Sequence, residues 1–115
     1  MILGVQGTRS FDKYSTIFLR GMGRALSLMG PEDTEFIVYA AGPANINSMA
    51  LEFVNVSNFK ARNIKAKVIR VSPSWLKNNM SSLDMFMYFC VPKENYSELC
   101  KIAEQKDIET EIYRY

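Results

Sequence analysis

The chain begins MILGVQGTRSFDKYS (residues 1–15), and this stretch decides the fold that the sequence predicts. A short strand pattern over residues 2–6 breaks at Gly7, and a helix pattern starts at Lys13. A strand, a short glycine-containing loop and a helix in this order are typical of the start of an α/β nucleotide-binding domain.

The composition predicts one globular domain that spans residues 1–115. Hydrophobic residues make up 48% and charged residues 23% of the 115 residues, as in an ordinary soluble domain. No apolar run is long enough for a membrane span and no secretion signal is visible, so we expect a cytoplasmic protein without a membrane partner. The net charge of +2 is too small for a dedicated nucleic-acid binder, so we expect no nucleic-acid partner, and we interpret the basic group at residues 60–70 as a solvated helix end and edge strand.

Histidine is absent and there are two cysteines, Cys90 and Cys100. The absence of histidine excludes a histidine general base and nearly all zinc chemistry. Both cysteines lie in apolar patterns, which predicts buried free thiols. An enzyme built from this chain would have to use carboxylates, lysine, tyrosine or groups of the substrate. We name no metal, no cofactor and no catalytic residue.

The hydrophobic pattern predicts a mainly parallel five-stranded sheet with the strand order 3-2-1-4-5 and helices on both faces. The first and fourth strands are the most apolar and are therefore central, whereas the third and fifth carry charges typical of edges. Ligands of such sheets bind at the carboxyl ends of the strands where the order reverses, here between strands one and four. The predicted strands cover residues 2–6, 35–41, 64–71, 85–91 and 108–115, the helices cover about 13–29, 45–59 and 93–105, and residues 72–82 form a polar connection.

The loop after the first strand is the first candidate phosphate site. Gly7 would let the backbone approach a phosphate, Thr8 and Ser10 would donate hydrogen bonds, and Arg9 would grip an anion. The alternative is an ordinary strand–helix turn in which Asp12 caps the helix.

The loop after the second strand offers Gly42, Asn45 and Asn47. Asn45 can adopt a left-handed conformation, and Asn47 can cap the next helix or contact a ribose hydroxyl. Simple capping is the alternative role for these residues.

A third group is the polar segment that holds Trp75, Asn79 and Asp84. The indole of Trp75, the only tryptophan, would stack on a base or instead cover the core. Asp84 precedes the fourth strand. It would act either as a polar residue of the site or as part of a turn.

These three segments together resemble the SLOG superfamily, which includes the DprA-like, lysine-decarboxylase-like (LOG) and YspA-like Rossmannoid proteins. YspA-like members have Gly-Ser/Thr-Arg in the first loop, matched by Gly7, Thr8 and Arg9. Their second loop reads Gly-Ala-x-Gly-Ala-Asp-x-x-Ala, where this chain has GPANINSMA (residues 42–50). Their Trp and Arg-Asn-x-x-Met segment is similar to Trp75 and the NNM of residues 78–80 in this chain.

The resemblance implies a Rossmann-like fold that binds a nucleotide or a nucleotide-derived ligand. Asn45 stands where the family has a glycine, Asn47 where it has an acid, and the glycine loop after the fourth strand is replaced by VPKEN (residues 91–95). The catalytic Arg and Glu of the phosphoribohydrolase branch have no counterpart. The compact form also looks like a phage-encoded version, which would place it in a host cytoplasm.

Three functions follow as hypotheses. The first, which we favour, is a small nucleotide-binding protein whose phosphate is held by residues 7–10. The second is a protein–protein interaction module, a homo-oligomer or a phage protein acting on a host factor, on a fold that has lost its ligand. The third, an enzyme acting through Asp12, Asp84 or Glu94, has the least support because the predicted loops hold no paired carboxylates.

Overall fold

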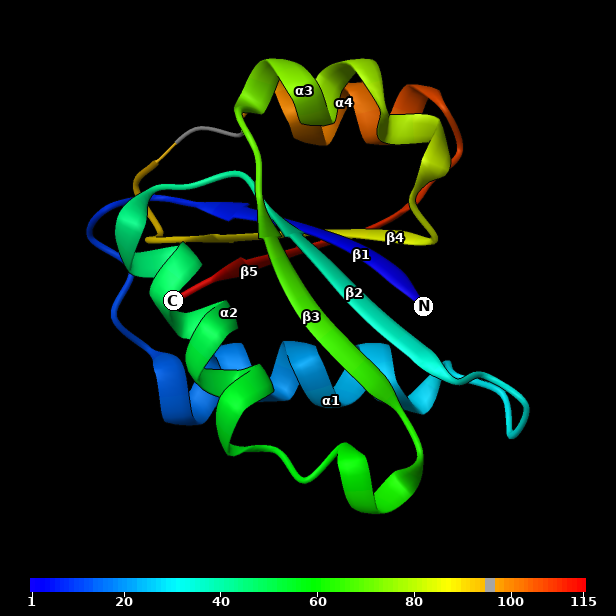
Figure 1. The fold of residues 1–115 in the computed structure, drawn as a ribbon. Helices are drawn as coiled ribbons and strands as arrows, with labels where there is room; N and C mark the ends of the chain where they lie inside the picture. The colour runs from blue at the N-terminus through cyan, green and yellow to red at the C-terminus, as the bar shows by residue number, and fades with distance from the viewer. Residues whose placement is uncertain (95–96) are drawn as a thin grey trace.

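The computed structural model describes residues 1–94 and 97–115 as a five-stranded, all-parallel sheet with helices on both faces (Figure 1). The strand order is β3-β2-β1-β4-β5, as predicted. The strands are β1 (Ile2–Gly7), β2 (Glu35–Ala40), β3 (Lys65–Arg70), β4 (Met85–Cys90) and β5 (Glu109–Arg114). The helices are η1 (Tyr14–Phe18), α1 (Leu19–Ser27), α2 (Ala44–Val56), η2 (Lys60–Arg62), α3 (Pro73–Asn78), η3 (Met80–Ser82) and α4 (Glu98–Gln105).

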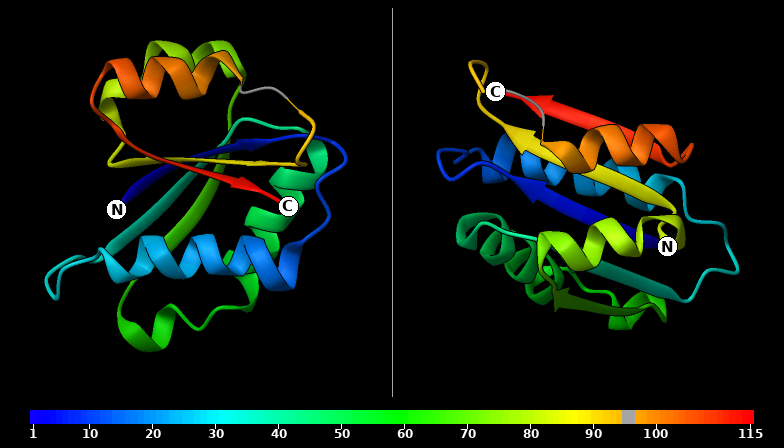
Figure 2. Two further views of the ribbon diagram at one scale, coloured as in Figure 1. Left: turned by 180° about the vertical axis from the view of Figure 1, so that it is seen from behind. Right: turned by 90° about the horizontal axis from the view of Figure 1, so that it is seen from above.

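Two hydrophobic clusters, one on each face of the sheet, form the core. α1 and α2 cover one face and α3 and α4 cover the other (Figure 2). β4 is buried along its whole length and lies between β1 and β5, which confirms the prediction of a central strand. β3 and β5 are the two edge strands, also as predicted.

Phe89, near the carboxyl end of β4, is the centre of the larger cluster. Its ring lies 4.8 Å from that of Phe18, 5.0 Å from that of Tyr113 and 5.4 Å from that of Phe11, measured between centroids. This aromatic group joins β4, β5 and the first helix, because each ring comes from a different element. It therefore fixes the residue 7–12 loop against the carboxyl edge of the sheet.

Three segments differ from the prediction made from the sequence. The connection at residues 72–82 contains helix α3 and the 3-10 turn η3, so it is not an irregular loop. The predicted helix over residues 13–29 starts as the π-helical turn η1 and has no side-chain cap; Asp12 does not cap it. The last helix begins at Glu98, after a turn at residues 92–93, and not at Lys93; Asn95 and Tyr96 of the predicted helix lie outside the described residues.

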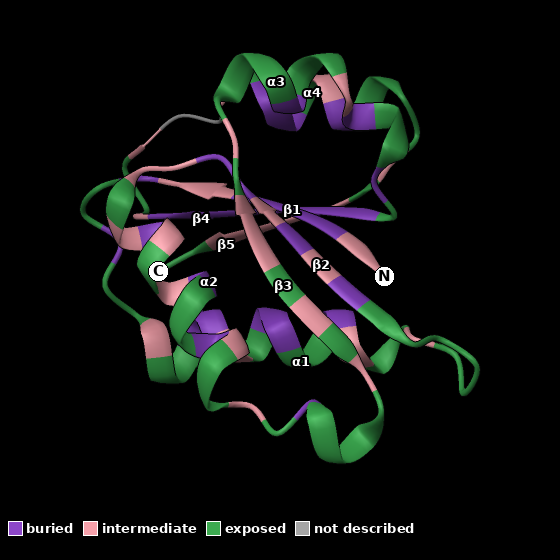
Figure 3. Cartoon of the chain, in the orientation of Figure 1, coloured by how far each residue is buried: buried purple, intermediate pink, exposed green. Residues whose placement is uncertain are grey.

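The α3 and α4 layer leaves part of its sheet face uncovered. Seen from above, β3 lies clear of both helices (Figure 2). Its residues are exposed or half-buried along the whole strand (Figure 3), whereas every residue of β4 is buried. The sheet therefore has one covered half, over β1, β4 and β5, and one open half, over β2 and β3.

Candidate functional site

The start of the predicted phosphate loop is hydrogen-bonded to the backbone of its neighbours. The N–H of Gly7 donates to the carbonyl oxygen of Gly42 at 3.2 Å, and the N–H of Thr8 donates to that of Phe89 at 3.0 Å. A Cβ atom on Gly7 would lie 2.3 Å from the carbonyl oxygen of Phe89 and 2.7 Å from a side-chain carbon of Ile46. The glycine is therefore explained by packing, and two of the amides expected to face a phosphate are already paired.

The second loop is tied to the first by Asn45. Its side-chain amide donates to the carbonyl oxygens of Thr8 at 3.0 Å and Phe11 at 2.9 Å. Asn45 belongs to helix α2 and is not in the left-handed region, whereas Gly42 has a φ of +87°, which favours glycine. These two residues thus have structural roles in joining the loops.

Asn47 is the other loop residue with a structural contact. Its Oδ1 accepts a hydrogen bond of 2.8 Å from the N–H of Gly42, so the side chain closes the loop that leads into α2. The N-cap position of α2 is occupied by Pro43, so Asn47 lies inside the helix.

The remaining polar groups of the first loop face different surroundings. The Oγ of Ser10 donates to the carboxylate of Glu94 at 3.1 Å, which brings the loops after β1 and β4 together as predicted and places a negative charge beside Ser10. Arg9 is exposed. Thr8 is buried, and its Oγ1 has no hydrogen-bond partner among the described residues.

Asp84 and Asn79 do not join this group. Asp84 precedes β4, and its carboxylate accepts a 2.7 Å hydrogen bond from the N–H of Ile2 at the start of β1. Because β1 and β4 are parallel, this contact lies at the amino edge of the sheet, opposite Gly7. Asn79 follows α3, and its side-chain amide donates to the carbonyl oxygen of Trp75 at 2.8 Å.

Between α3 and α4 lies a cavity of about 200 Å³ over Gln6. The amide oxygen of Gln6 is buried without a hydrogen-bond partner. Lys77, which lines the cavity, forms an ion pair of 3.1 Å with Glu98. The cation of this cavity is therefore already neutralised.

Trp75 borders a larger hollow, of about 530 Å³, at the carboxyl ends of β2 and β3. Trp75 is 37% exposed as a residue, and its ring lies 4.7 Å from the ring of Tyr39, between centroids. Ile69, Val71 and Ser72 complete the wall, with Arg70 at the rim of the edge strand. This hollow was not predicted from the sequence, although Trp75 was singled out.

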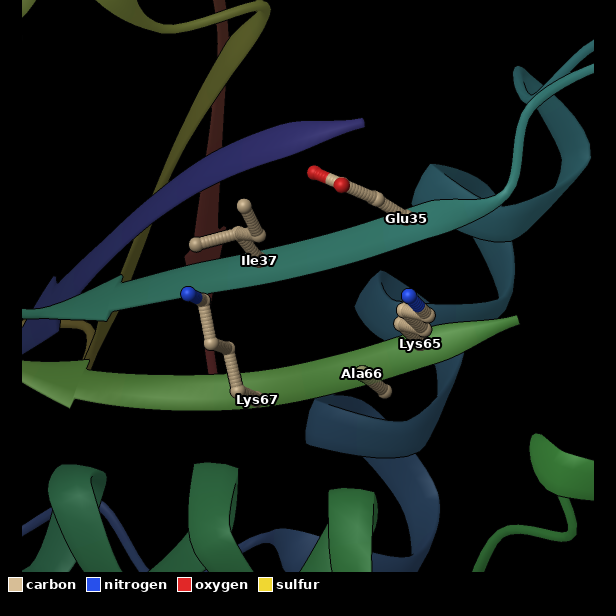
Figure 4. A pocket seen from close by; sticks show the side chains of 5 residues that line it. All are labelled: Glu35, Ile37, Lys65, Ala66 and Lys67. Atoms are coloured by element: carbon tan, nitrogen blue, oxygen red, sulfur yellow. The ribbon is translucent and has the colours of Figure 1, made fainter.

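A second, smaller hollow of about 130 Å³ continues along the same two strands toward their amino ends (Figure 4). The strand register pairs Glu35 with Lys65, Ile37 with Lys67, and Tyr39 with Ile69. Paired residues of a parallel ladder point to the same face. We call this surface the open face; it consists of Ile37, Tyr39, Lys65, Lys67, Ile69 and Trp75.

The sequence signal for the open face was the alternation of Lys65, Lys67 and Ile69, which places all three on one side of the strand. What the sequence could not supply is the register with β2 and the position of Trp75. In the part of the chain that the structure describes, no group of histidine, cysteine or acidic residues could hold a metal ion. Among the same residues, no helix is long and apolar enough to cross a membrane.

Comparisons of the chain with protein-family models, with curated proteins and with solved structures found no match.

Proposed function

We propose that the protein binds a nucleotide on the open face, with the base stacked against Trp75 and a phosphate near Lys67. The observation that carries the proposal is Trp75, an exposed residue whose ring packs beside that of Tyr39 and which borders a hollow of about 530 Å³. An aromatic surface of this kind binds any base by its flat face, with a contribution of roughly 1–3 kcal/mol per base. The resemblance to the SLOG proteins points to the same class of ligand.

The platform is held rigidly at its backbone. The N–H of Trp75 donates to the Oγ of Ser72 at 3.0 Å, and its carbonyl oxygen accepts the side chain of Asn79 at 2.8 Å. Both ends of the short helix therefore fix the residue that carries the indole. A platform that is already ordered loses little conformational entropy when a base stacks on it.

Lys67 supplies the charge that a phosphate needs. It lies two residues before Ile69 on β3, which is a rise of about 7 Å along the strand. Lys67 forms no ion pair among the described residues, unlike Lys77 in the neighbouring cavity. The geometry therefore favours the open face over the residue 7–10 loop, where Glu94 faces Ser10.

The single tryptophan makes the proposal directly measurable. We expect AMP and UMP to quench the fluorescence of Trp75 in a saturable way, and ribose 5-phosphate, which has no base, to leave it unchanged. A Lys67→Gln variant should bind AMP roughly threefold more weakly. A Lys101→Gln variant, which removes the same charge from α4, should bind as the original protein does.

Absence of a saturable fluorescence change with any nucleotide at millimolar concentration would count against the proposal. Equal binding of AMP by the Lys67→Gln variant and the original protein would show that Lys67 does not bind the phosphate.

A protein–protein interaction is the second candidate function, and two exposed apolar residues of α2 favour it. Leu51 is 40% and Val56 is 69% exposed, so both side chains are available to a partner. If they mediate self-association, light scattering after gel filtration would give a mass above that of the single chain. Changing both residues to serine would then return the mass to that of the monomer.

A further inference from the structure

The cations of residues 60–70 lie along one side of the molecule. This segment, KARNIKAKVIR, has five basic residues and no acid. All five are exposed, and none of them forms an ion pair among the described residues, whereas Arg24, Lys77 and Lys13 each lie within 4 Å of a carboxylate. We call this surface the basic flank; it consists of Lys60, Arg62, Lys65, Lys67 and Arg70.

The basic flank follows the free edge of the sheet. β3 is an edge strand, and η2, which holds Lys60 and Arg62, precedes its amino end (Figure 1). Trp75 lies beyond its carboxyl end. A strand of six residues is about 20 Å long, so the cations extend well beyond the hollow at Trp75.

Two carboxylates lie beside this line, those of Glu35 and Asp33; Asp33 lines a hollow together with Arg62. Glu35 is the one on the open face. It is paired in the strand register with Lys65, although no ion pair joins the two side chains. Figure 4 shows Glu35 beside Ile37 on β2, with Lys65 and Lys67 on the neighbouring strand. Glu35 therefore offsets part of the charge of Lys65. Asp33 offsets part of that of Arg62, although neither carboxylate forms an ion pair with the flank among the described residues. Lys67 lies on the open face between Lys65 and the hollow at Trp75.

A free nucleotide uses little of this surface. Its phosphates are at one end of the molecule, so it reaches the cations near Trp75 and not those of η2. Sites for small ligands also enclose most of the ligand, whereas both hollows lie on an open sheet face. A chain of linked nucleotides makes many weak contacts at once, and an open, charged and aromatic surface suits it.

We propose that the ligand of the open face is single-stranded nucleic acid, with bases on Trp75 and phosphates along the basic flank. This inference rests on the proposed nucleotide binding and adds the class of ligand to it. A duplex is a poor fit, because its bases are stacked on one another and their faces are not available to Trp75.

The test compares a labelled oligothymidylate of about ten nucleotides with TMP, using fluorescence anisotropy for the oligomer and Trp75 quenching for both. We expect the oligomer to bind at least tenfold more tightly than TMP. The double variant Lys65→Gln/Lys67→Gln should weaken oligomer binding about tenfold and reduce the slope of log K against log salt by about 1.4, because each phosphate contact on a single strand contributes about 0.7. The matched control, Lys101→Gln/Lys106→Gln, removes two charges near α4 and should change neither value.

The outcomes separate this inference from the proposed nucleotide binding. Quenching by TMP without tighter binding of the oligomer would overturn the inference and leave nucleotide binding standing. No quenching by either ligand would overturn both. Equally tight binding of polyglutamate would assign the flank to an acidic protein, and equally tight binding of a duplex would show that bases are not read, so either result overturns the inference.

Discussion

Gly7 shows at the scale of one residue how packing, and not a ligand, accounts for a glycine. A Cβ atom there would lie 2.3 Å from the backbone oxygen of Phe89, an atom that cannot move without disturbing β4. We expect Gly7→Ala to lower the free energy of unfolding by about 3 kcal/mol, the upper range for overpacking a core. Urea denaturation measures this change.

Gly23 provides the matched control. It lies in α1, and a Cβ atom there would meet nothing within 4 Å. Gly23→Ala should therefore raise the free energy of unfolding by up to about 1 kcal/mol, since alanine is the better helix former. Equal effects of the two substitutions would contradict the packing explanation of Gly7.

At the scale of elements, the cysteines of β4 and α4 test the core directly. Cys90 and Cys100 are free and fully buried, as predicted, and burial raises the pKa of both thiols. Only the thiolate reacts with disulfide reagents. At pH 8 we expect both thiols of the native protein to react at least a hundredfold more slowly with Ellman's reagent than those of the urea-unfolded chain, as followed by absorbance. Fast reaction of one thiol in the native protein would show that its element opens.

The strands were predictable because their apolar runs are distinct from one another. β4 has no charged residue and is central, whereas Lys65 and Lys67 mark β3 as an edge, and the order 3-2-1-4-5 followed from this contrast. Helix α3 was missed because its polar surface resembles a loop. The signal was nevertheless present: Ser72 is the N-cap, Pro73 is the first helical residue, and Leu76 is buried.

The candidate site was harder to predict because it depends on contacts between distant segments. The sequence predicted that Trp75 stacks on a base or covers the core, but its partner Tyr39 is 36 positions away in the sequence. The sequence analysis selected the loop residues Gly42, Asn45 and Asn47 as possible ligand contacts. In the structure their polar groups form hydrogen bonds within the protein. The residue types predicted which polar and aromatic side chains are present. Only the strand register showed which of these side chains have no internal hydrogen-bond partner among the described residues and lie on the open face.

For the whole molecule, alkaline pH is the condition that should weaken the fold. Burial is the main cause that raises the pKa of Cys90, Cys100, Tyr88 and Tyr113, and the pKa of Tyr88 reaches about 12. Hydrogen bonding to Glu111 further raises the pKa of Tyr113. Each of these groups is neutral when protonated, so the folded protein holds its proton at a pH where the unfolded chain has released it.

The sign of the effect follows from proton binding. Above about pH 8.5 for cysteine and pH 10 for tyrosine, the unfolded chain binds fewer protons than the folded protein, so the free energy of unfolding falls as the pH rises. We expect the urea midpoint to decrease steadily between pH 9 and 11, whereas the absence of histidine removes the usual side-chain titration between pH 6 and 8. Tyr88→Phe should flatten the decrease above pH 10, because phenylalanine keeps the buried ring and has no proton to lose. A midpoint that stays constant up to pH 11 would mean that these four groups are reached by water in the folded protein.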